Sequence, residues 1–216
     1  MIEAVVFDFD GTILDTESVW YDSFRIVLSE HGVDLPVSVF AKGIGTFDNS
    51  LFAYIEEKLG PDTDLVQLKA KAFEIHQSRA SELALREGVI DYLDSAQRLG
   101  LRIGLATSSS KSWVEPYLTR YDLLRYFETV CTGDDVEKVK PDPALYALAA
   151  DRLGVKPAAA VAFEDSANGA LAAVRAGLRC VIVPNSLTAD LEFGSHDLRI
   201  SSMADLPLEE LLKKVG

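Results

Sequence analysis

Short apolar runs that are rich in β-branched residues alternate with segments of helical periodicity over most of the chain. Six of these runs are typical of strands, at residues 3–9, 101–107, 129–133, 160–165, 179–184 and, more weakly, 198–201. Helical patterns at 111–121, 143–153 and 166–176 separate the later strands. Nearly continuous apolar strands that alternate with helices are typical of a parallel sheet covered on both faces. The pattern therefore predicts an α/β fold with a Rossmann-like, doubly wound parallel sheet.

The interval between the first two strands breaks this alternation, because it contains only helical periodicity. We expect helices at 19–31, 49–59 and 64–85, and a last helix at 91–99 that returns to the sheet. A single crossover between parallel strands does not need that much helix. We therefore predict a helical cap domain at 16–83, inserted into an α/β catalytic core formed by 1–15 and 84–216.

Composition narrows the classes of partner. The chain has 216 residues, of which 48% are hydrophobic and 25% charged, enough for one large domain or a core with a smaller one. Its formal net charge of -13 repels nucleic acid and anionic membranes, so we expect neither as a partner. A small anionic substrate remains compatible with this charge where local positive groups override the net field.

Two features bear on where the protein acts. Cys131 and Cys180 both stand in apolar surroundings, and we expect them to be reduced core residues. The first residues lack the pattern of a signal peptide, and no apolar run approaches the roughly 20 residues of a membrane helix. We expect a cytoplasmic protein that is a monomer or a weak dimer.

Polar side chains gather at one end of every main strand. In open α/β sheets, ligands bind beyond the carboxyl ends of the strands, so we searched only the residues that follow each strand. The first four predicted strands lead in turn to Asp8 and Asp10, to Thr107 and Ser108, to Lys140, and to Glu164 and Asp165. The convergence of these residues at one edge predicts a single site.

The residue types at this edge favour metal and phosphate chemistry. Carboxylates without a neighbouring histidine or cysteine form a hard oxygen site, which suits Mg²⁺ better than zinc. Lys140 is a point charge suited to a phosphate, and Thr107 and Ser108 can donate further hydrogen bonds to an anion. An ionised aspartate can be a nucleophile that forms an aspartyl phosphate, and a second carboxyl group can transfer protons. Asp8 and Asp10 are spaced for these two roles.

Four motifs together resemble the haloacid dehalogenase superfamily of phosphotransferases. They are DFDGT at 8–12, the threonine at 107, KPDP around Lys140, and EDSANG from Glu164 onward. The likeness spans nearly the whole chain, with the motifs in the family's order. The pattern DxDGTxxDTE and the helical insertion resemble the subgroup of β-phosphoglucomutase-like phosphatases.

The resemblance implies a role for each matched residue. Asp8 would be the nucleophile and Asp10 the general acid and base. Thr107 and Lys140 would hold the phosphoryl group. Mg²⁺ would be bound by the Asp8 carboxylate, the Asp10 main-chain carbonyl and Asp165. Glu164 would be a further ligand or would support the ligands from outside, and an aspartate at position 10 implies phosphate chemistry rather than dehalogenation.

One departure from the family pattern bears on the reaction. The mutase relatives carry a histidine in the first cap helix and an arginine in a later cap loop, where this chain has Trp20 and, by an ungapped match, Phe47. A mutase needs a cation in the cap to hold its second phosphate, so the departure favours hydrolysis, although Lys42 or Arg79 could still supply that charge. We take Thr16, Trp20 and Phe47 as candidate specificity residues.

The prediction is therefore a Mg²⁺-dependent phosphatase that hydrolyses a small phosphorylated metabolite, such as a sugar phosphate, through an aspartyl phosphate. A β-phosphoglucomutase-type phosphosugar mutase is the first alternative. A receiver-type signalling domain would also combine acids, Mg²⁺ and a lysine, but it would lack the long helical insertion. An inactive binding module is disfavoured, because no expected catalytic position is missing. The alternative without a functional site is that Asp8 and Asp10 only cap a turn and that Ser108 only caps the start of a helix.

Overall fold

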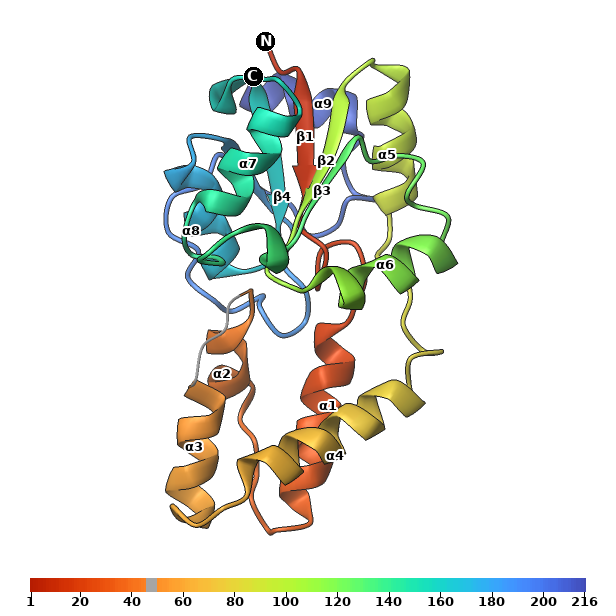
Figure 1. Cartoon of the computed structure of the whole chain (residues 1–216). Helices are drawn as coiled ribbons and strands as arrows, with labels where there is room; N and C mark the ends of the chain where they lie inside the picture. The colour runs from red at the N-terminus through yellow and green to blue at the C-terminus, as the bar shows by residue number, and fades with distance from the viewer. Residues whose placement is uncertain (46–49) are drawn as a thin grey trace.

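A six-stranded parallel sheet forms the centre of the computed structural model, which describes residues 1–45 and 50–216 (Figure 1). The strands are β1 (Ala4–Phe7), β2 (Arg102–Ala106), β3 (Thr129–Cys131), β4 (Ala160–Glu164), β5 (Arg179–Ile182) and β6 (Leu198–Arg199). Their order in the sheet is β3-β2-β1-β4-β5-β6, and every neighbouring pair is parallel. The predicted fold class is confirmed, together with all six predicted strands.

Helices cover both faces of the sheet, because alternate residues of each strand point to opposite sides. Val5 and Phe7 face a core closed by α5 (Val89–Arg98), α6 (Lys111–Arg120) and α9 (Leu208–Val215). Ala4 and Val6 face a second core closed by α7 (Ala144–Arg152) and α8 (Ala167–Arg175). The short helix α9 was not predicted. Cys131 and Cys180 are buried free thiols, as predicted.

Four helices lie apart from the sheet, at the end toward which the strands point (Figure 1). They are α1 (Glu17–Ser29), α2 (Val37–Phe40), α3 (Ser50–Leu59) and α4 (Leu65–Ser78), with the 3₁₀ turn η1 (Ala41–Gly43) after α2. We call these elements the helical insertion. Its own core includes Phe24, Leu28, Ile55 and Leu68. The division into a core and a cap at 16–83 remains a prediction.

The predicted helix over 64–85 is wrong beyond Ser78, where α4 ends. The apolar pattern continues through Leu83 and Leu85, but these side chains pack against the core of the sheet instead of the insertion. Leu85 forms an antiparallel bridge with Leu14, and Tyr121 donates a hydrogen bond to the Leu83 carbonyl. Tertiary contacts therefore override the helical pattern in this segment.

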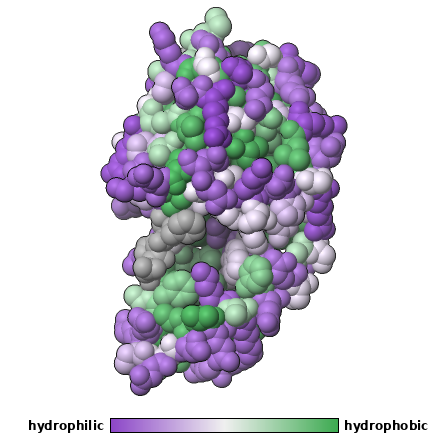
Figure 2. Space-filling view, viewed as in Figure 1, coloured by the Kyte–Doolittle hydropathy of each residue, from purple (hydrophilic) through white to green (hydrophobic). Residues whose placement is uncertain are grey.

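The surface carries many of the polar side chains of the protein. Hydrophilic side chains cover much of the face shown in Figure 2, which is hollowed at the level where the helical insertion meets the sheet. Among the described residues, no helix is long and apolar enough to span a membrane.

Candidate active site

Lys140 joins two acidic side chains at the carboxyl end of the sheet. Its Nζ donates to Asp8 Oδ1 at 2.5 Å and to Glu164 Oε1 at 2.6 Å. Asp8 directly follows β1 and Glu164 ends β4, and these two strands are neighbours in the sheet. Lys140 comes from the loop before α7. The three side chains are almost inaccessible to solvent, with relative exposures of 6% for Asp8 and 1% for each of the other two.

This cluster holds more negative charge than Lys140 can balance. Oxygen atoms of Asp8, Glu164 and Asp165 lie within 4.8 Å of one another, so three carboxyl groups share one ammonium. Burial raises the pKa of Asp8 to about 8, against the opposing charge of Lys140. Burial and then the charge of Asp8 raise the pKa of Asp165 well above its usual value. Burial disfavours the Lys140 ammonium, but Asp8 and Glu164 raise its pKa above the ordinary value.

The donor set fits a hard divalent cation. Three carboxylates and one ammonium leave two negative charges when all are ionised, and a divalent ion would balance them. Every ligand atom in the cluster is an oxygen, as Mg²⁺ prefers. Asp165 is oriented by two donors, Thr12 Oγ1 at 3.3 Å and Asn185 Nδ2 at 2.7 Å. These residues could hold a magnesium ion.

Glu164 is occupied on both of its oxygens. Oε1 accepts from Lys140 and also from the Tyr146 hydroxyl at 2.6 Å, and Oε2 accepts from the Ser166 hydroxyl at 3.1 Å. Helix α8 packs so closely on this carboxylate that a Cβ added at Gly169 would lie 2.0 Å from it. The packing fixes Glu164 against Lys140.

Asp10 stands outside this charged cluster and is held by three donors. Thr16 Oγ1 and Trp113 Nε1 donate to its Oδ1 at 2.8 and 2.9 Å, and Ser109 Oγ donates to its Oδ2 at 2.6 Å. Thr16 directly precedes α1, Ser109 lies in the loop before α6, and Trp113 lies in the first turn of α6. The half-buried Asp10 is therefore fixed by residues from both the helical insertion and the sheet domain.

The two predicted phosphate-binding residues after β2 have different surroundings. Thr107 is buried, and its Oγ1 accepts from the main-chain N–H of Ser109 at 3.1 Å. Ser108 Oγ donates to the Gly45 carbonyl at 3.0 Å. Asn168 on α8 donates to the neighbouring Ile44 carbonyl, also at 3.0 Å. The segment after η1 is thus bonded to the loop after β2 and to the first turn of α8.

Of the three candidate specificity residues, the structure describes Thr16 and Trp20. The Thr16 hydroxyl is engaged with Asp10. Trp20 stacks on His76, with ring centroids 4.2 Å apart, and also lies against Trp113. Phe47 lies outside the described residues, and so do its contacts.

Several residues that shape the site were not singled out from the sequence. Tyr146 and Asn185 orient the carboxylates, and Trp113 holds Asp10. Arg86 donates to the carbonyls of Gly11, Val183 and Pro184 at 2.6–2.7 Å, so it ties the loop after Asp10 to the end of β5. Of these residues, only Asn185 could have been found from the sequence, because it directly follows the fifth predicted strand.

Glu17 is a further acidic group near the site. It is the first residue of α1, and burial, followed by the charges of Asp10 and Asp8, raises its pKa to about 8. The sequence places it in the DTE motif at 15–17, in which only Thr16 was taken as a candidate functional residue.

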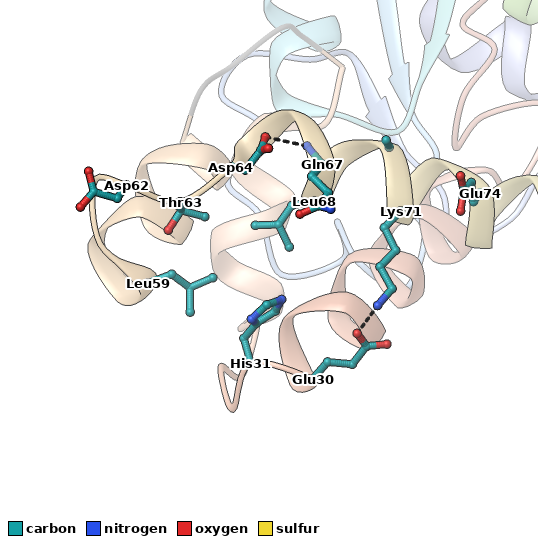
Figure 3. Close-up of a pocket in the computed structure, with 11 residues that line it drawn as sticks. Glu30, His31, Leu59, Asp62, Thr63, Asp64, Gln67, Leu68, Lys71 and Glu74 are labelled. Atoms are coloured by element: carbon teal, nitrogen blue, oxygen red, sulfur yellow. Dashed lines mark hydrogen bonds and ion pairs between the residues drawn. The ribbon is translucent and has the colours of Figure 1, made fainter.

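A separate groove lies far from these residues. It has a volume of about 770 Å³ between the ends of α1 and α3 and the side of α4 that faces them, and it includes the ion pair of Glu30 with Lys71 (Figure 3). The groove shares no residue with the cluster around Lys140. The buried charges and bound carboxylates, rather than the size of a cavity, mark the candidate active site.

The fold is that of a known family of hydrolases. Residues 5–183 match the model of the haloacid dehalogenase-like hydrolases. The chain therefore belongs to this family, and it is an enzyme of the phosphatase class.

Individual relatives match over almost the whole chain. YhcW of Bacillus subtilis (strain 168) is 48% identical over 98% of this chain and 97% of its own length. The phosphorylated carbohydrates phosphatase of Thermotoga maritima is 32% identical over 98% of this chain and 97% of its own length. A similar solved structure is that of CbbY from Rhodobacter sphaeroides in complex with phosphate. Its sequence is 32% identical to this chain, and the two structures superpose with a TM-score of 0.78 over 98% of this chain and 99% of that one.

Proposed function

We propose that this protein is a Mg²⁺-dependent phosphatase that hydrolyses a small phosphorylated metabolite, in the first instance a sugar phosphate, through an aspartyl phosphate on Asp8. The observation that carries the proposal is the buried contact of Lys140 with Asp8 and Glu164, with Asp10 fixed next to it. Similarity to a phosphorylated carbohydrates phosphatase and to a protein crystallised with phosphate supports the substrate class.

Asp8, Asp165 and the Asp10 main-chain carbonyl would hold the Mg²⁺ ion. When bound, the ion would neutralise the carboxylates and stabilise negative charge on the phosphoryl oxygens. We assign Glu164 to holding Lys140 instead, because both Glu164 oxygens already accept hydrogen bonds. This arrangement leaves Lys140 and Thr107 to bind the phosphoryl group.

Asp8 would be the nucleophile. Among the described residues, its hydrogen bond is made to Oδ1 by Lys140, so Oδ2 is available for attack or for the metal. A carboxylate oxygen of Asp8 forms a bond to phosphorus, and the bond from phosphorus to the ester oxygen breaks.

Asp10 would move the proton in both steps. It gives a proton to the leaving alcohol in the first step and then takes one from the water that attacks the aspartyl phosphate. The second step releases inorganic phosphate and restores Asp8. The three donors around Asp10 support this role, because they fix the direction of its carboxyl group.

A phosphosugar mutase is the alternative. It would need a cation of the helical insertion that faces the second phosphate. Arg79, one candidate, is engaged with Asp22 and Glu82 at 3.2 and 2.8 Å. Position 20 offers the neutral ring of Trp20. These observations favour hydrolysis.

Phosphate release from a panel of phosphorylated metabolites, with Mg²⁺ and with chelator, tests the proposal. The panel includes β-glucose 1-phosphate, and formation of glucose 6-phosphate is followed in parallel. We expect Mg²⁺-dependent release that Asp8→Asn abolishes without loss of the fold. Retention of substantial activity in Asp8→Asn would remove the nucleophile assignment. Conversion of one hexose phosphate to the other without release would establish the mutase. The cytoplasmic location and the monomeric or weakly dimeric state stay predictions.

A further inference from the structure

Trp113 contacts Asp10 directly from the first turn of α6. Its Nε1–H donates to Asp10 Oδ1 at 2.9 Å. An indole N–H is a donor only and exchanges no proton in this role, so Trp113 cannot relay the proton that Asp10 transfers. Its effect on Asp10 is therefore one of position.

The ring of Trp113 is held by aromatic groups from the helical insertion. Trp20 of α1 lies 5.9 Å from it and His76 of α4 lies 5.2 Å from it, measured between ring centroids. Trp20 and His76 also stack on each other at an interplanar angle of 25°. On its other side, Trp113 meets Tyr117 edge to face at 5.4 Å. The half-buried indole thus lies between aromatic rings of the insertion and Tyr117 of its own helix.

His76 behaves as a neutral ring in this cluster. It is fully buried, and neither ring nitrogen has a hydrogen-bond partner among the described residues. A buried polar group without a hydrogen-bond partner costs about 1–3 kcal/mol. At this position, the packing of the flat ring against its aromatic neighbours therefore outweighs the loss of its hydrogen bonds. Burial lowers the pKa of His76 to about 4, in keeping with an uncharged ring against the indole.

The three donors to Asp10 come from three places in the chain. Thr16 and Trp113 share Oδ1, whereas Ser109 binds Oδ2. Thr16 and Ser109 are small side chains at the ends of loops. Trp113 is the donor whose position depends on packing across the junction between the insertion and the sheet domain.

We propose that Trp113 is a positioning residue for Asp10, and that Trp20 and His76 hold its indole against the carboxyl group. This inference rests on the proposed function, in which Asp10 protonates the leaving group. A contact of the insertion with the sheet domain thereby sets the geometry of proton transfer.

The test compares leaving groups in Trp113→Phe, which keeps an aromatic ring and removes the N–H donor. The rate of phosphoryl transfer to Asp8 is measured in single turnovers with 4-nitrophenyl phosphate and with the best sugar phosphate of the panel. Nitrophenolate leaves without protonation, whereas a sugar hydroxyl requires it. General acid catalysis contributes about 10²–10⁴-fold, so we expect the sugar phosphate reaction to slow at least about tenfold and the nitrophenyl reaction by less than about threefold.

Two further variants separate positioning from packing. Tyr117→Phe lies on the same helix and contacts the same indole, and we expect it to slow both substrates equally or not at all. Trp20→Leu leaves the N–H of Trp113 in place but removes its neighbour, and we expect it to reproduce the dependence on the leaving group. Its rates are compared at saturating concentrations of each substrate, so that weaker binding through the candidate specificity residue Trp20 does not enter them. Trp20→Leu then tests the positioning role where circular dichroism shows that Trp113→Phe is unfolded.

The outcomes distinguish this inference from the proposed function. Equal slowing of both substrates in folded Trp113→Phe, or no slowing, would overturn the positioning role while the parent protein still phosphorylates Asp8. A folded Trp20→Leu variant without dependence on the leaving group would overturn the part assigned to the insertion. No phosphorylation of Asp8 in the parent protein would overturn the proposed function and the role of Asp10 with it.

Discussion

Lys140 Nζ lies 2.6 Å from Glu164 Oε1, and both side chains are almost inaccessible to solvent. Because the same ammonium also contacts Asp8, one positive charge joins the ends of two neighbouring strands. Removal of one partner of a buried ion pair leaves an uncompensated charge in a poorly solvated place. The stability of the metal-free protein should therefore depend on Lys140.

We expect Lys140→Met to lower the free energy of unfolding in chelator by roughly 3–5 kcal/mol, because Asp8 and Glu164 lose their counter-charge. Urea unfolding followed by circular dichroism measures the change. Lys138→Met, an exposed lysine two residues earlier in the same loop, is the matched control and should change stability little. Equal stability of the two variants would show that the buried contact contributes nothing.

Gly169→Ala tests the packing of α8 on Glu164. Helix propensity alone predicts that alanine stabilises this helical position by about 1 kcal/mol. The added Cβ would instead lie 2.0 Å from the Glu164 carboxylate, so we expect a loss of roughly 1–3 kcal/mol and a strong loss of phosphatase activity. Thermal melts and activity measured on the same preparation decide between a gain and a loss of stability. A stabilised and active variant would contradict the geometry at Gly169.

Mg²⁺ should raise the stability of the parent protein, because it would balance the excess negative charge of the carboxylates. A ligand present at 100 times its dissociation constant stabilises the folded state by about 2.7 kcal/mol. We expect the melting temperature to rise with Mg²⁺ in the parent and in Asp190→Asn, an exposed control. Asp165→Asn should show no such rise. A full response in Asp165→Asn would remove Asp165 from the ligand set.

The His76 ring should make stability depend on pH. Burial lowers its folded-state pKa to about 4, whereas the usual value of 6.5 applies in the unfolded chain. Both states are neutral above pH 6.5, so the contribution of this ring to stability is fully present there. As pH falls from 6.5 toward 4, the unfolded chain takes up a proton first, and about 3 kcal/mol of stability is lost.

His76→Phe should remove this part of the pH dependence, and it also removes the two ring nitrogens that have no hydrogen-bond partner among the described residues. Unfolding free energies of the parent and the variant, measured between pH 4 and 7.5, give the difference that belongs to His76. His31→Gln, at an exposed position, is the control and should follow the parent. A constant difference between parent and His76→Phe across this range would contradict the shifted pKa.

Much of the site follows from the sequence because parallel strands bring their carboxyl ends to one edge. Asp8 and Glu164 end strands that proved to be neighbours, and Lys140 follows the strand two places away from β1. The chemical types at these positions then restrict the ligands. The convergence of these residues at one edge could therefore be predicted without side-chain geometry, whereas the contact of Lys140 with both acids could not.

The remainder depends on packing that no local pattern encodes. Trp113 occupies an ordinary position in the first turn of a helix, and only the placement of α6 brings its N–H to Asp10. Tyr146 likewise has the sequence pattern of an apolar core position, and only the placement of α7 brings its hydroxyl to Glu164. The end of α4 at Ser78 was missed because the apolar spacing continues while the chain turns back toward the sheet.

The bridge between Leu14 and Leu85 brings the entry and the exit of the helical insertion side by side. The whole insertion is therefore a long loop of the sheet domain, and the two ends of this loop are in contact. Each doubling of loop length costs only about 0.6 kcal/mol of closure entropy. Closure entropy therefore sets little limit on the length of a helical segment between these two leucines. A replacement segment must still supply the contacts that Thr16 makes with Asp10 and that Trp20 and His76 make with Trp113, because these lie within it.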